Sequence, residues 1–277
     1  MEENIQIGRG SVIPTQTVQP TETTQKKYDF PTEVISLPSE GKAYPEGHPL
    51  SNGTVEIKLM TAREEDILSS QNLIKKGIVL EKLFESVMID PKLADEMLVG
   101  DKNAVLIVSR MLAYGPEYVV EMTDPYSGLK QKQSIDLSEL KPKEIDYSQL
   151  NPQNRYTFTT PSGRVIEFKL LTHKDEKDIT AEIQAMQRLT KSETSLDLTT
   201  RLKKMITGID GNTDRGTINR YVDTQMLARD TKAFRDNLRK ISPDLDLKFN
   251  FVSESTGEVE ALDIPFGVDF FYPTEWL

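Results

Sequence analysis

The chain has 277 residues, of which 37% are hydrophobic and 28% are charged, so we expect a packed core in one large domain or two modest ones. The absence of cysteine excludes disulfides, thiolate catalysis and cysteine-ligated zinc, and the formal net charge of -10, with Lys and Arg interleaved among acidic residues, offers no basic face for a nucleic acid. Because the N-terminus lacks a secretory signal pattern and no apolar run approaches the roughly 20 residues that span a bilayer, the sequence predicts a soluble protein made in a cytoplasm, with no membrane partner.

Residues 1–33 are predicted to form an N-terminal arm. The stretch 11–27 is rich in Thr, Gln and Pro and holds few large apolar side chains, so burial cannot offset the entropy of ordering it. It is either a flexible tail or an arm that orders against a neighbouring protein. We expect order to begin near Tyr28.

Residues 34–140 are predicted to form a first α+β unit. The stretch Ile35–Leu50 holds three Pro and two Gly, which indicates turns and loop, and Thr54–Leu59 then alternates apolar and polar residues as a half-buried strand does. Thr61 is the predicted N-cap of the next helix, with Glu64 completing a capping box. Consecutive carboxylates such as those of residues 64–66 splay around a helix, so capping explains them better than metal ligation.

Two further helices and a hairpin complete this unit. The helices are predicted over Val79–Met88, with one apolar face, and Lys102–Leu112, which is followed by the helix-stopping pair Gly115–Pro116. The hairpin consists of a strand over Tyr118–Met122, a tight turn over Asp124–Gly128 and a returning strand.

The same order of elements recurs in the second half. Glu167–Thr172 matches Glu56–Thr61 as a strand that ends in threonine. One ungapped offset then pairs Asp101 with Asp230, Arg110 with Arg239 and Gly128 with Gly257. These identities are few and could arise by chance, but the shared order favours duplication. The sequence therefore predicts an α+β fold of two tandem, duplicated units, with a linker at 141–153 and a second unit at 154–277.

The last fourteen residues contain five aromatic side chains, including the only Trp. Chain ends are normally polar, so this segment either closes the core of the second unit or presents an anchor to a partner protein. The candidate partner interface consists of Phe266, Phe270, Phe271, Tyr272, Trp276 and Leu277.

We predict no catalytic residue, no cofactor and no metal site. His48 lies in a loop rich in Pro and Gly, and His173 follows the predicted N-cap Thr172, so both are expected at the surface. Asp210–Asp214 resembles the start of a calcium loop, but the twelfth position holds Tyr221 where a bidentate Glu is required, so a turn explains it better.

Three motifs resemble one protein family. They are T-x-x-E-E-D-I-L at 61–68, L-I-K-K-G at 73–77, and the block G-D-K-N-A at 100–104 followed by Y-G-P-E-Y at 114–118. They are similar to motifs of the baseplate hub subunit and hub assembly family of T-even-type contractile-tailed bacteriophages, over about the first 140 residues. The resemblance implies a structural, non-enzymatic virion protein that binds other baseplate and tail proteins, in several copies within a symmetric assembly. In many relatives the turn at 123–128 carries two cysteines that could hold zinc, and here it has none.

Two alternative functions remain open at this stage. The chain could be a transient chaperone whose acidic surface masks a basic hub subunit. It could also be a carboxylate-based hydrolase, which would require a glutamate of raised pKa and a second carboxylate roughly 5–9.5 Å away across one cleft.

Overall fold

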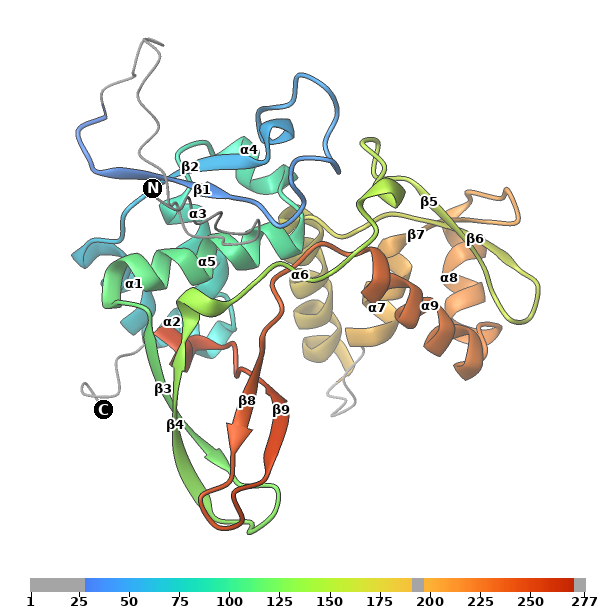
Figure 1. Ribbon diagram of the computed structural model, residues 1–277. Coiled ribbons are helices and arrows are strands. Elements are labelled where there is room, and N and C mark those ends of the chain that lie inside the picture. The colour runs from blue at the N-terminus through green and yellow to red at the C-terminus, as the bar shows by residue number, and fades with distance from the viewer. Residues whose placement is uncertain (1–27, 191–196, 272–277) are drawn as a thin grey trace, which may run out of the picture.

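The computed structural model describes residues 28–190 and 197–271, and the fold is of the predicted α+β class (Figure 1). In chain order the first half contains β1 (Thr32–Ser36), η1 (Pro49–Asn52), β2 (Thr54–Lys58), α1 (Ala62–Ser69), α2 (Gln71–Lys76), α3 (Val79–Val87), α4 (Pro91–Glu96), α5 (Val99–Tyr114), β3 (Glu117–Thr123), β4 (Lys130–Asp136) and η2 (Leu137–Glu139). The second half contains η3 (Tyr147–Gln149), β5 (Tyr156–Thr159), β6 (Val165–Phe168), α6 (His173–Thr190), α7 (Asp197–Met205), β7 (Ile206–Ile209), α8 (Arg215–Thr224), α9 (Ala228–Ile241), β8 (Lys248–Val252), β9 (Val259–Asp263) and η4 (Val268–Phe271). Over the described ranges, no helix combines the length and apolar character that crossing a membrane requires.

The predicted start of α1 is confirmed at atomic detail. The Thr61 amide donates to the Glu64 carboxylate at 2.8 Å, and the capping box is complete. The hydroxyl of Ser86, at the end of α3, donates to the other oxygen of Glu64 at 2.6 Å. Burial would raise the pKa of Glu64, but the hydrogen bonds from Ser86 and Thr61 lower it overall. One acidic residue therefore caps α1 and joins it to α3.

Strands and helices of the first unit lie close to their predicted positions, with three omissions. The predicted strands and the helix at 79–88 are confirmed as β2, β3, β4 and α3, whereas α5 begins at Val99, three residues before the prediction. The sequence interpretation missed β1 and the short helices α2 and α4. Residues 1–27 of the predicted arm lie outside the described residues, and β1 already begins at Thr32.

The two halves share an order of elements and a tertiary contact. The hairpins β1–β2 and β5–β6 are each followed by helices, by a strand-like segment that pairs with the second hairpin strand, and by the hairpins β3–β4 or β8–β9. In the first half, Asp101 of α5 accepts the amide of Ser39 at 2.9 Å. In the second half, Asp230 of α9 accepts the amide of Ser162 at 3.1 Å. Both serines lie between the two strands of the leading hairpin, so the shared contact favours the predicted duplication.

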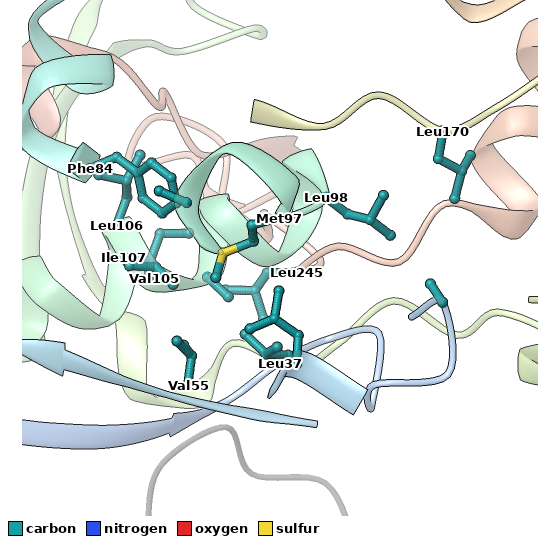
Figure 2. Packing of buried hydrophobic residues seen from close by; sticks show 14 of the residues in the cluster. Leu37, Val55, Phe84, Met97, Leu98, Val105, Leu106, Ile107, Leu170 and Leu245 are labelled. Atoms are coloured by element: carbon teal, nitrogen blue, oxygen red, sulfur yellow. The ribbon is translucent and has the colours of Figure 1, made fainter. Parts of the chain in front are cut away.

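The halves are interlocked at the start of α5. The amide of Val99 donates to the carbonyl of Leu171 at 3.1 Å, and the amide of His173 donates to that of Met97 at 2.8 Å. The predicted linker is also paired, because the amide of Lys143 donates to the carbonyl of Asp244 at 2.9 Å. Figure 2 shows α5 within the core, with Leu245 and Leu170 of the second half among the buried side chains around it.

Gly100, in the first turn of α5, lies at the closest approach of the two halves. A Cβ atom built there would stand 1.8 Å from the carbonyl oxygen of Pro243, a backbone atom that cannot swing aside. We therefore expect Gly100→Ala to lower the free energy of unfolding by about 1–3 kcal/mol, as overpacking does. Urea denaturation measures this change. Gly77→Ala is a poor control because Gly77 has a positive φ, whereas Gly267→Ala meets nothing within 4 Å and should be tolerated.

Candidate protein-interaction surface

The hairpins β3–β4 and β8–β9 lie side by side, and their turns meet at the end far from the helices (Figure 1). Their turns are built alike. The amide of Asp124 donates to the carbonyl of Leu129 at 2.8 Å, and the amide of Ser253 donates to that of Glu258 at 2.9 Å. Each turn ends in a glycine with φ near +72°, a conformation that side chains rarely adopt. The predicted turn at 124–128 is thus confirmed, and its counterpart repeats it.

The Asp124 carboxylate joins the two turns. It accepts the amide of Tyr126 at 2.8 Å and the hydroxyl of Ser127 at 2.7 Å within its own turn. From the other hairpin it accepts the hydroxyls of Ser253 at 2.7 Å and Ser255 at 3.0 Å. Burial alone would raise the pKa of Asp124, but these donors together hold it well below its ordinary range. The charged carboxylate therefore connects the hairpins throughout the neutral pH range.

A glutamine adds a second connection between the hairpins. The side-chain amide of Gln131, on β4, donates to the carbonyl of Val252 at 2.6 Å and accepts the amide of Glu254 at 3.0 Å. Gln133 donates to the same carbonyl at 3.3 Å. These contacts imitate the hydrogen bonds of a sheet, so the two hairpins behave as one element.

We expect Asp124→Ala to loosen this pair of turns. The substitution leaves the hydroxyls of Ser253 and Ser255 without their shared acceptor, while α5 and its surroundings are unaffected. Amide hydrogen exchange of Ser253 and Glu254 should accelerate, whereas amides in the interior of α5 should keep their protection. Unchanged exchange at the turns would contradict this role for Asp124.

Large apolar side chains are exposed at this end of the molecule. Among the described residues, ten large apolar side chains are exposed, and four of these lie on the two hairpins near their turns: Tyr126, Leu129, Val252 and Val259. Leu129 is 69% exposed and Val259 is 60% exposed, and Val252 and Val259 are cross-strand partners. Exposed apolar groups that gather on one projecting element are typical of a protein-binding surface. The sequence interpretation did not single out these residues as a binding surface, although Tyr126 lies within the predicted turn at 124–128 and Leu129 follows it.

The described residues of the predicted C-terminal partner interface lie mostly in the core. Phe270 and Phe271 are buried, at 1% and 0% exposure, and Phe266 is partly buried against them. The rings of Phe270 and Phe271 are therefore not presented to a partner by the folded chain. The other predicted interface residues, Tyr272, Trp276 and Leu277, lie outside the described residues.

The C-terminal aromatic segment closes the core of the first unit, whereas the sequence favoured the second unit or a partner. Arg110 of α5 donates to the carbonyls of Gly115 at 2.6 Å and Glu117 at 2.8 Å, and more weakly to that of Phe270 at 3.4 Å. The ring of Phe270 lies 4.8 Å from that of Tyr118 on β3. The segment reaches this corner because β9 runs antiparallel to β8, back from the turns towards the helices (Figure 1).

His173 is buried, contrary to the predicted surface position. Its backbone begins α6 against Met97, and its ring stands edge-on to Phe84 at 4.7 Å, so the first turn of α6 packs under the other half of the chain. Neither ring nitrogen has a hydrogen-bond partner among the described residues. Burial, followed by the positive charges of Lys102 and Lys177, lowers its pKa to about 4. His48 is half-buried and contacts Glu96 at 2.7 Å.

The depressed pKa of His173 predicts a loss of stability in acid. The unfolded chain takes up this proton below its ordinary pKa of about 6.5, whereas the folded chain resists protonation until about pH 4. The contribution of neutral His173 to the free energy of unfolding is therefore full above pH 6.5 and is lost as the pH falls towards 4. Between pH 7 and pH 5 this loss is about 2 kcal/mol. Urea denaturation at both pH values should show a smaller loss in His173→Leu than in the natural chain.

Other candidate sites have structural explanations. Asp214 caps α8 by accepting the amide of Thr217 at 2.7 Å, and Asp210 and Gly211 adopt positive φ in the turn before it, which confirms the predicted turn. In the described part of the chain, no group of three or more His, Asp or Glu could hold a metal ion. A groove of about 650 Å³ lies between the halves, and charged residues that line it form ion pairs with one another, as Lys169 does with Asp175 at 2.7 Å.

Comparisons of the chain with protein-family models, with curated proteins and with solved structures gave no match.

Proposed function

We propose that this chain is a structural component of a bacteriophage tail baseplate hub, where it binds other baseplate and tail proteins in several copies. The observation that carries the proposal is the projecting pair of hairpins, whose exposed apolar side chains are suited to contact with another protein. A transient role in hub assembly is the alternative, and an enzymatic role is the least supported.

Residues of the motifs that resemble the hub family make contacts that stabilise the fold. Thr61 and Glu64 form the capping box of α1, and Gly100 and Asp101 lie where α5 meets the rest of the chain. Gly115 ends α5 and its carbonyl accepts Arg110 at 2.6 Å. Motifs of this kind support a shared architecture, and they carry no catalytic group.

The carboxyl groups give little support to the hydrolase alternative. Among glutamates with a clear pKa shift in the described residues, Glu64, Glu85 and Glu121 all shift downward, whereas the proposed acid requires an upward shift. The pKa of Asp101 is raised to about 6, mainly by burial, but this side chain is fully buried and accepts Tyr44 and Ser39. These contacts indicate that Asp101 has a structural role in the core.

The decisive experiment measures this polypeptide in purified mature particles and in infected cells. A structural hub component is expected in both, at a fixed ratio to other baseplate proteins, and a particle reconstruction should contain the paired hairpins in contact with a neighbour. Presence in infected cells with absence from mature particles would support the assembly alternative. Absence of any association with tail proteins in both samples would refute the proposal.

A further inference from the structure

We infer that the tip of the paired hairpins docks onto a protein surface that is apolar at its centre and basic at its rim. The tip is defined by Tyr126, Leu129, Val252 and Val259 together with the carboxylates of Glu254, Glu258 and Glu260. This inference deepens the proposed function and rests on it for the setting, but its chemistry comes from the tip alone.

The charge of the tip is predominantly negative. Glu254, Glu258 and Glu260 are exposed, and none forms an ion pair with the described residues. The neighbouring Lys130 is already paired with Glu121 at 2.7 Å, which leaves Lys132 as the exposed base on β4. The negative charges therefore lie beside the apolar side chains without internal compensation. A partner that covers them stabilises the contact if it supplies Lys or Arg.

The carboxylates and the apolar side chains belong to one surface, although they come from different hairpins. Desolvation, followed by the charges of Glu260 and Glu258, raises the pKa of Tyr126, which means that these carboxylates of the second hairpin lie near this ring of the first. Val252 and Val259 are opposite each other on the second hairpin. A partner that contacts the apolar residues consequently meets the acidic ones as well.

Charge also decides among classes of partner. A second copy that used the same tip would bring two sets of three carboxylates together, and the chain as a whole carries a net charge of -10. Nucleic acids and anionic membrane surfaces are repelled for the same reason. A basic protein surface is the occupant that the tip fits.

The connection between the hairpins prepares the tip for binding. Asp124 and Gln131 hold the two turns in one arrangement before any partner arrives, so less conformational entropy is lost on docking. The tip also projects from the helices, so a partner can reach it without displacing the core (Figure 1).

Site-specific photo-crosslinking in the cells that naturally make the chain tests this inference. The full-length chain carries p-benzoylphenylalanine in place of Leu129 or Val259, and in place of Leu198 of α7, another exposed leucine, as the control position. A second series adds Glu254→Gln, Glu258→Gln and Glu260→Gln. The matched control series instead adds Asp29→Asn, Glu46→Gln and Glu182→Gln, which changes the net charge equally at other exposed positions.

The tip positions are expected to crosslink to another protein, at peptides with an excess of Lys and Arg, whereas Leu198 does not. Neutralising the tip carboxylates should lower the crosslink yield roughly fivefold or more, because three charge pairs with the partner are lost. The matched control series should retain the yield. No crosslink from either tip position, an equal loss in both series, or crosslinks only to a second copy or to nucleic acid would overturn the inference.

The same experiment separates this inference from the proposed function. If the tip crosslinks to a basic protein that is not a tail protein, the docking surface is supported and the hub role is refuted. If the chain is found in baseplates but its tip gives no crosslink, the hub role is supported and the docking surface is refuted, because other surfaces then make the contacts.

Discussion

A chain that ends at Asp269 is expected to lose most of its stability. The missing Phe270 and Phe271 are fully buried and meet edge to face with ring centroids 5.3 Å apart, and Phe270 also packs on Tyr118. Removing one buried phenylalanine side chain costs about 3–5 kcal/mol, and the two losses overlap because the rings touch. Since whole proteins are stable by about 5–15 kcal/mol, a large fraction of this shortened chain should be unfolded. Urea denaturation followed by circular dichroism measures the effect.

A second truncation distinguishes a core role from a partner role. A chain that ends at Phe271 keeps both buried rings and lacks Tyr272, Trp276 and Leu277, which were predicted to face a partner. If those residues serve only partner contacts, this chain should unfold at the same urea concentration as the full-length protein but enter particles less efficiently. Equal denaturation midpoints for the chain ending at Asp269 and the full-length chain would refute the core role.

The second large effect is expected from Asp101→Ala. Asp101 is fully buried and accepts the Tyr44 hydroxyl at 2.6 Å and the Ser39 amide at 2.9 Å, and Tyr44 in turn accepts the amide of Leu98 at 2.9 Å. Alanine leaves two buried donors without acceptors, and each such group costs about 1–3 kcal/mol. We therefore expect a loss of about 2–6 kcal/mol in the free energy of unfolding, measured by urea denaturation.

Asp230→Ala provides the matched control, because Asp230 holds the corresponding position in the second half. Its partner is Ser162, whose amide and hydroxyl both donate to it, at 3.1 Å and 2.8 Å. Ser162 is exposed, so water can replace the lost acceptor. The loss should be clearly smaller than for Asp101→Ala. A larger loss from Asp230→Ala would mean that burial at the hairpin does not govern this contact.

Asp101 and His173 should affect the pH dependence of stability in opposite directions. The raised pKa of Asp101, about 6, means that its contribution is full below the ordinary value near 3.8 and is lost as the pH rises through 6. The contribution of His173 is instead lost as the pH falls from 6.5 towards 4. The two partly cancel in the natural chain, so acid destabilisation should be stronger in Asp101→Asn than in the natural protein.

Much of the local structure can be predicted from short-range patterns in the sequence. A period of two predicts the strand at Thr54–Lys58, and one apolar face predicts the helix at Val79–Val87. The turn residues at Asp124–Gly128 predict the first hairpin turn, and Thr61 with Glu64 predicts the start of α1. The missed elements are short. The strand β1 has five residues but places Val34 next to Ile35, so it shows no period of two. The helices α2 and α4 have six residues each, which is less than two helical turns and too few for a helical period to stand out.

By itself, the sequence determined the fold class and the order of most elements, because caps, turns and periods act between neighbours in the chain. Only the tertiary structure decided that His173 is buried, that Phe270 and Phe271 close the first unit, and that Asp124 joins the two hairpins. Each of these outcomes depends on residues far apart in the chain, such as Arg110 with Phe270 and Asp124 with Ser253. Periodicity within a short window contains no information about such pairs, because they form only when the two halves pack together.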